Sequence, residues 1–255
     1  RTRRKLEEHD FRLPSPNELP GALSTVHTVL YLLFNEGYFS TTDRPILEDV
    51  CRDAMSLTRL LVAEPSLSDS NTVALLALMC FAAARQESRI DDQGRLVPLD
   101  RQDRSTWDVA LINEGFTQLQ RSSEMEALRA GRYHLEAAIA ARHCSAASFE
   151  QTDWASICNL YDRLLEVMPS ALTRLNRAVA ISYRSGPDEA IVLVEELQAS
   201  GELPHSHVVA ASLANLYGRA GQPERAAHYL EAALAQAGTE HERRLIELQV
   251  TQPDR

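Results

Sequence analysis

Two short polar segments interrupt an otherwise helical sequence, and their residue types are suited to a binding or catalytic site. The first is Phe34-Asn-Glu-Gly-Tyr38, which ends an apolar stretch; the second is Gln102-Asp-Arg-Ser-Thr-Trp-Asp108, where charges lie beside a large aromatic residue. A structural interpretation makes them a helix end and a helix start, with Asp103 or Ser105 as the N-cap and Trp107 in the core. A functional interpretation makes them a polar pocket or a contact site.

We predict that these two segments meet at one end of the N-terminal half. Helix ends leave backbone groups unpaired and buried charges need partners, so a shared network would satisfy both demands. Arg104 is expected to pair with Glu36 or Asp103, and Trp107 to cover the network. The candidate network comprises Asn35, Glu36, Tyr38, Gln102, Asp103, Arg104 and Trp107. The alternative is a small-molecule-sensing or enzymatic helical domain with a polar pocket around Glu36, Asp103, Arg104 and Trp107.

Other residues with chemical potential have simpler explanations. His205 and His207 lie at a helix start and are interpreted as solvated or capping residues rather than metal ligands. His143 and Cys144 are adjacent and therefore point to different helix faces, which disfavours a catalytic pair. The glycines form no phosphate-binding motif, and the four cysteines form no CxxC pair, as is typical of a reducing cytoplasm. We expect no enzyme activity, cofactor or metal.

Charge and hydropathy narrow the class of protein further. The 255 residues carry a net charge of −10, which disfavours a bulk nucleic-acid binder. The longest apolar run, Val73 to Ala84, has 12 residues and is too short to span a bilayer, so no membrane association is expected.

Hydrophobic periodicity predicts an all-α protein in three parts. Residues 1–20 are a basic start followed by a proline-rich linker, residues 21–130 an N-terminal helical half, and residues 131–255 tetratricopeptide-like helical hairpins. The first helix is expected to end at Gly37 as a left-handed cap, and the third to run from about Asp69 to Arg89 as the most buried helix of its half. One short β-hairpin at most is expected, near residues 90–99, because Gly94 separates two apolar pairs.

A repeat of about 36 residues runs through the C-terminal part. The unit from His207 fits the tetratricopeptide pattern best, with Leu213, Tyr217, Gly221 and Ala226 at its signature positions. In such repeats the first helix of each pair lines a concave groove, and an apolar strip with two amides suits a peptide backbone. The candidate groove comprises Leu172, Leu175, Asn176, Val179, Tyr183, Val208, Ala211, Asn215 and Arg219. In the alternative, the final helix, with Leu245, Ile246 and Leu248, covers this surface.

The chain resembles the tetratricopeptide-containing C-terminal extension of a group of bacterial extracytoplasmic-function sigma factors of RNA polymerase. The resemblance runs from Pro14 onward and is most specific at Asn35-Glu-Gly37 and Gln102-Asp-Arg104. Further matching segments are Leu30–Tyr38, Leu75–Met79, Trp107-Asp108, Ala137–Ala141 with His143, Thr152–Trp154, Leu160–Asp162 and Leu175–Ala180.

The resemblance implies a regulatory and protein-interaction role in transcription initiation in the cytoplasm. Arg1-Thr-Arg-Arg-Lys-Leu6 is similar to the end of the DNA-reading helix of sigma region 4. The implied partners are the protein's own sigma regions 2 and 4, core RNA polymerase and a small YCII-like protein. Promoter DNA would be bound only through N-terminal regions that this chain lacks.

Overall fold

The computed structural model describes residues 14–15, 17–38, 46–125, 130–203 and 207–251, and across them the fold is all-α, as predicted. The elements of the N-terminal half are α2 (Leu19–Tyr38), α3 (Glu48–Ala63), α4 (Ser70–Ala83) and α5 (Val109–Met125). Those of the C-terminal half are α6 (Arg132–Ser145), α7 (Trp154–Val167), α8 (Ala171–Ser185), α9 (Pro187–Ser200), α10 (His207–Arg219), α11 (Pro223–Gln236) and α12 (Glu240–Thr251). Residues 1–13, which include all of the basic start, and His205 lie outside the described residues.

Helix α4 forms the centre of the N-terminal half. Its sequence is apolar on all sides, and it packs against α2, α3, α5 and α6. Val73, Ala74 and Leu75 are 0% exposed, which confirms the prediction that this helix is deeply buried. The helix begins at an Asp69 cap whose carboxylate accepts a 2.7 Å hydrogen bond from the Thr72 backbone N–H.

The predicted boundaries of this half need two corrections. Helix α4 ends at Ala83 rather than Arg89, and residues 84–89 form a turn and the short 3-10 helix Glu87–Arg89. The helix expected from about Ser105 begins at Val109, after a 3-10 turn at Arg104–Thr106. A 2.9 Å hydrogen bond from the Asp108 N–H to the Ala84 carbonyl joins the two irregular stretches, so tertiary contact rather than helical periodicity sets both ends.

Residues 90–99 form the one hairpin-like feature that the sequence predicts. A single antiparallel bridge links Ile90 and Leu96, and Gly94 takes a φ of 74° at the turn. The Asp91 carboxylate accepts hydrogen bonds from the backbone N–H groups of Gln93 and Arg95, which holds the turn closed without a longer ladder.

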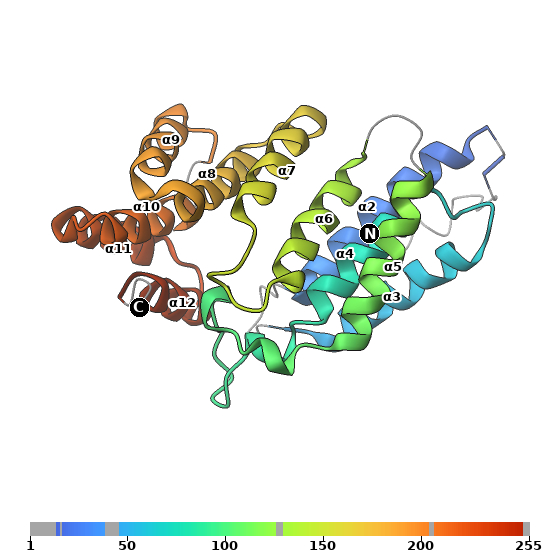
Figure 1. Ribbon diagram of the computed structural model, residues 1–255, viewed down its shortest axis with the longest axis horizontal. Helices are drawn as coiled ribbons and strands as arrows, with labels where there is room; N and C mark the ends of the chain where they lie inside the picture. Colours follow the sequence, from blue (N-terminus) through green and yellow to red (C-terminus); the bar gives the residue numbers. More distant parts are fainter. Residues whose placement is uncertain (1–13, 16, 39–45, 126–129, 204–206, 252–255) are drawn as a thin grey trace, which may run out of the picture.

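Helix α6 joins the two halves, because its small residues pack into the N-terminal core. Ala137 and Ala141 form one buried cluster with Ala77 and Phe81 of α4. From α6 onward, successive antiparallel helices stack side by side and curve away from α2–α5 (Figure 1). Pro187 and Pro223 lie in the first turns of α9 and α11, as predicted.

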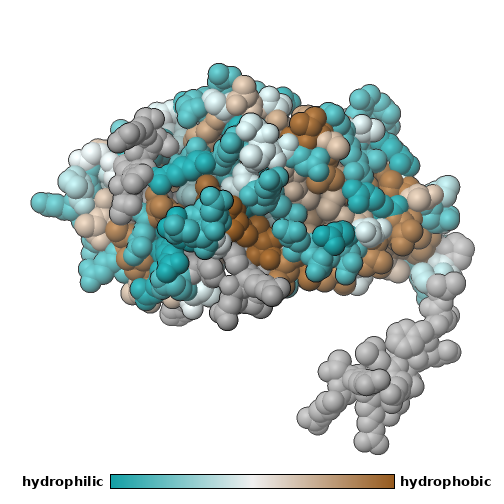
Figure 2. Space-filling model, turned by 90° about the horizontal axis from the view of Figure 1, so that it is seen from below, coloured by the Kyte–Doolittle hydropathy of each residue, from teal (hydrophilic) through white to brown (hydrophobic). Residues whose placement is uncertain are grey.

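The curved stack has a concave face lined by residues of α8, α10 and α12. The segment between the hairpin and α5 runs beside α12 on this side of the molecule (Figure 1). Seen from below, the surface is mainly hydrophilic, with a hydrophobic strip across its middle (Figure 2). No helix among the described residues is long and apolar enough to cross a membrane.

Candidate functional site

The first polar segment lies at the C-terminal end of α2 and is anchored from the 3-10 helix Glu87–Arg89, which follows α4. The Arg89 guanidinium donates a 3.0 Å hydrogen bond to the Tyr38 carbonyl and lies 3.6 Å from the centre of the Tyr38 ring. Both residues are buried, whereas Glu36 is exposed. Gly37 is not the left-handed cap that we expected: it lies within α2, where α3 approaches its backbone closely.

The second polar segment is anchored to the same turn after α4. Arg85 Nε donates to Gln102 Oε1 at 3.2 Å, and Trp107 Nε1 donates to Ser88 Oγ at 2.8 Å. Arg85, Ser88 and Arg89, in the turn after α4, therefore contact both predicted segments and link them. The ion pair that we predicted between the segments does not form. Sequence reasoning missed these residues because it continued the helix through them.

The predicted pairing of Arg104 with Glu36 or Asp103 is wrong. Arg104 Nη1 instead donates to the carbonyl oxygens of His143 and Ala146, at 2.6 and 2.8 Å, and so caps the C-terminal end of α6. Its guanidinium lies 4.8 Å from the centre of the Trp107 ring. The Asp103 carboxylate accepts hydrogen bonds from the Ser105 backbone N–H and hydroxyl, as one of the predicted caps. This cluster joins the two halves of the molecule, because Arg104 precedes α5 and its partners lie at the end of α6.

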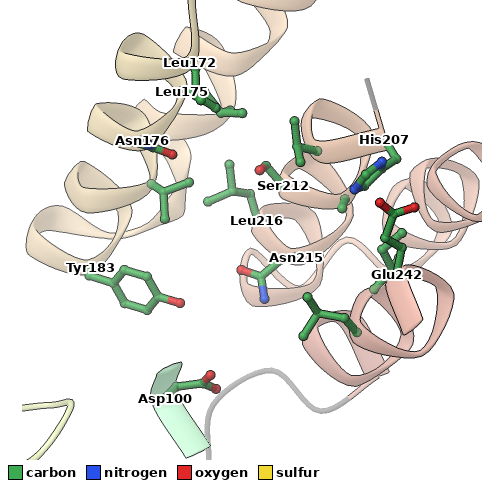
Figure 3. Close-up of a pocket in the computed structure, with 15 residues that line it drawn as sticks. Asp100, Leu172, Leu175, Asn176, Tyr183, His207, Ser212, Asn215, Leu216 and Glu242 are labelled. Atoms are coloured by element: carbon green, nitrogen blue, oxygen red, sulfur yellow. The ribbon is translucent and has the colours of Figure 1, made fainter. Parts of the chain in front are cut away.

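The C-terminal half contains a cavity of about 300 Å³ on its concave face. Helices α8, α10 and α12 provide three sides, and Asp100 lies at one end (Figure 3). Eight of the nine predicted groove residues line it: Leu172, Leu175, Asn176, Val179, Tyr183, Val208, Ala211 and Asn215. We call this cavity the groove.

Arg219, the ninth predicted residue, has a different position. Its guanidinium donates to the hydroxyl and the carbonyl oxygen of Ser182, at 2.8 and 3.0 Å. It also lies 4.2 Å from the centre of the Tyr183 ring and fixes that ring in place. Arg219 therefore supports the wall of the groove rather than lining it.

Helix α12 forms a wall of the groove and leaves the cavity open. Ile246 is buried against Ala210, Ala211 and Ala233, and Leu245 faces the cavity. The segment before α5 is tied to this helix, since Arg101 Nη2 donates a 2.9 Å hydrogen bond to the Leu248 carbonyl. This contact, across 147 positions, was not predictable from periodicity.

A second cavity, of about 230 Å³, adjoins the groove and shares Asp100, Asn176, Val179 and Tyr183 with it. Its walls are largely aromatic. The Trp154 and Tyr183 rings stack with their centres 4.6 Å apart, and Phe149 and His143 meet the Trp154 ring edge-on. We call this second cavity the aromatic cavity; its remaining lining residues are Pro98, Leu99, Ile157, Tyr161 and Ala180.

His143 and Cys144 do not form a catalytic pair. Burial raises the pKa of the Cys144 thiol to about 11, and its Sγ faces the Phe81 carbonyl at 3.8 Å. Burial, together with the positive charges of Arg85 and Arg104, lowers the pKa of His143 to about 3. A protonated thiol beside a neutral imidazole is unsuited to nucleophilic catalysis. No group of three or more potential metal-ligating side chains is found among the described residues.

The buried imidazole predicts an acid-sensitive fold. Because the pKa of His143 is lower in the folded protein than in the unfolded chain, its contribution to stability is complete above pH 6.5 and is lost as the pH falls towards 3. Between pH 7 and pH 5 the titration of His143 is expected to lower the free energy of unfolding by about 2 kcal/mol. Replacing His143 with phenylalanine is expected to remove this part of the pH dependence, which urea unfolding at several pH values measures. A variant whose free energy of unfolding changes with pH as much as that of the unmodified chain would contradict this prediction.

Fold and cavities together define an all-α helical-repeat protein with a concave groove. The N-terminal half, at residues 22–123, matches a family of unknown function (DUF6596). The chain is also similar to an uncharacterized protein of Rhizobium meliloti (strain 1021), with 36% identity over 248 residues. That match covers 94% of this chain and 56% of the relative, so the chain spans little more than half the length of that protein.

Proposed function

We propose that this chain is the C-terminal regulatory and protein-interaction region of an extracytoplasmic-function sigma factor and acts in the cytoplasm. The proposal starts from the resemblance of its polar and helical segments to that group. A longer relative, of which the chain spans 56%, fits a protein with further regions. Those further regions would bind promoter DNA, and the chain would regulate them without catalysing a reaction.

The groove is the observation that carries the proposal. The Asn176 amide and the Ser212 hydroxyl line it and have no hydrogen-bond partner among the described residues. Leu172, Leu175 and Leu245 supply apolar surface beside them. An extended or helical segment needs both apolar contacts and partners for its backbone, so this lining suits a peptide. The segment would come from sigma region 2 or 4, core RNA polymerase or a YCII-like protein.

The geometry favours this proposal over a sensor or enzyme that uses the polar pocket. Trp107 is buried, Asp103 caps a 3-10 turn, and Arg104 binds carbonyl groups of α6 and the following turn. Neither cavity of the concave face is lined by these residues or by Glu36.

Transcription with purified polymerase tests the proposal. The double change Asn176→Ala with Asn215→Ala removes both groove amides and is expected to alter promoter-specific transcription by the full-length protein about tenfold, in the same direction as cutting the protein within Pro14–Pro20. Each lost hydrogen bond corresponds to about 0.5–1.5 kcal/mol of binding.

The matched control is Asn113→Ala with Asn159→Ala, which changes two exposed helical asparagines away from the groove. It is expected to leave transcription unchanged. Unaltered transcription in a folded Asn176→Ala, Asn215→Ala protein would refute a functional groove. An uncut and a cut protein of equal activity would refute the regulatory role as a whole.

A further inference from the structure

The aromatic cavity has the size of a site for one side chain rather than for a complete ligand. Its volume of about 230 Å³ lies below the roughly 300–1,000 Å³ of sites for drug-sized molecules. It adjoins the groove, because Asp100, Asn176, Val179 and Tyr183 line both cavities. A chain lying in the groove therefore passes the side of this cavity formed by the shared residues, which we call its mouth.

The walls of the cavity favour an aromatic ring. Trp154 and Tyr183 are held as a stacked pair, with 22° between their planes, by Phe149 on one side and by the Arg219 guanidinium over Tyr183. Such a preformed aromatic wall offers an incoming ring edge-to-face and stacking contacts in addition to the burial of its apolar area. Aromatic side chains that enter a desolvated pocket are also typical anchors of protein interfaces.

The polar groups at the mouth favour a ring that donates a hydrogen bond. The shared residues there include the Asp100 carboxylate and the Asn176 amide, whose oxygen atoms accept hydrogen bonds. An indole N–H or a phenol O–H can donate a hydrogen bond to the Asn176 amide oxygen, which has no hydrogen-bond partner among the described residues, whereas a phenyl ring or an aliphatic side chain cannot. A lysine or arginine is disfavoured, because Arg101 lies 3.9 Å from Asp100 and already offsets its charge.

From these contacts we infer that the aromatic cavity is the anchor socket for a tryptophan or tyrosine side chain of the segment that lies in the groove. The inference rests on the proposed peptide-binding function and names the side-chain class that this site selects. It assigns Trp154, Tyr183 and Phe149 to holding the ring, and the Asn176 amide oxygen to receiving its polar hydrogen.

Methyl NMR with amino-acid amides tests the socket on this chain alone. Ile157 lines only the aromatic cavity and Leu245 only the groove, so their methyl signals separate the two sites. N-acetyl-tryptophanamide and N-acetyl-tyrosinamide at millimolar concentration are expected to shift the Ile157 signal and to leave Leu245 unchanged. N-acetyl-leucinamide and N-acetyl-lysinamide are expected to bind at least tenfold more weakly. The inference would be overturned if the leucine or the lysine amide bound as tightly as the aromatic amides, or if the aromatic amides left the Ile157 signal unshifted.

A blocking variant supplies the second arm. Asn176 is exposed on α8 at the shared mouth, so Asn176→Phe obstructs entry without entering the core, and it is expected to weaken N-acetyl-tryptophanamide binding at least tenfold. The control Val192→Phe places the same ring on an exposed position of α9 and is expected to bind normally. Unchanged binding by a folded Asn176→Phe protein would refute the socket. Because neither arm uses polymerase or promoter, loss of the socket is separable from loss of the proposed role in transcription.

Discussion

Replacing Gly37 with alanine is expected to destabilise the protein by about 2 kcal/mol, because the helix α3 approaches α2 where a side chain would stand. A β-carbon on Gly37 would lie 2.8 Å from Cys51 Sγ and 2.9 Å from both the Cys51 nitrogen and the Leu47 carbonyl oxygen. Two of these atoms belong to the backbone, so the overlap could be removed only if the start of α3 moved away from α2. The 2.7 Å hydrogen bond from the Leu47 N–H to the Gly37 carbonyl would be strained with it.

Gly21 provides a matched control within the same helix. A β-carbon there would meet nothing within 4 Å, and alanine favours a helix interior by up to about 1 kcal/mol over glycine. Gly21→Ala is therefore expected to leave stability unchanged or to raise it slightly. Urea unfolding of the two variants measures the contrast. Equal stability of the two would show that the contact between α2 and α3 is not the reason for glycine at position 37.

Replacing Arg104 with alanine is expected to lower the free energy of unfolding by about 2 kcal/mol. The change leaves the carbonyl oxygens of His143 and Ala146 without their charged donor, and hydrogen bonds to charged groups contribute about 1.5–3 kcal/mol. Part of this loss of stability is offset because Arg104 is only half-buried, so water can hydrogen-bond to the two carbonyl oxygens in its place. Thermal unfolding should show a melting temperature lower by about 4–8 °C.

A double-mutant cycle separates the observed contacts from the ion pair that the sequence suggested. Arg104→Ala and Trp107→Leu are expected to be non-additive by about 0.5–1 kcal/mol, because the guanidinium lies over the indole ring. Arg104→Ala and Glu36→Ala are expected to be additive within about 0.5 kcal/mol, since Arg104 is directed towards the end of α6. Coupling to Glu36 instead of Trp107 would restore the original pairing and contradict the structure.

The groove was largely predictable because it follows from a repeated local pattern. The repeat places one face of each first helix on the concave side, so residues such as Leu175 and Ala211 could be assigned from their spacing alone. Arg219 was misplaced, although its position in the repeat was right, because a long flexible side chain can turn to Ser182 and Tyr183. The aromatic cavity was not predicted, since its walls come from four separate parts of the chain.

By itself the amino-acid sequence determined the all-α class and the order of the hairpins, because helical periodicity, prolines in first turns and glycines with positive φ act within a few residues. Only the tertiary structure decided how the two polar segments are satisfied. Arg104 reaches carbonyl groups 39 and 42 positions away, and Arg101 reaches one 147 positions away. A guanidinium can donate hydrogen bonds to any carbonyl or carboxylate oxygen of suitable geometry. Its partner therefore depends on which of these oxygens the folded chain brings within reach.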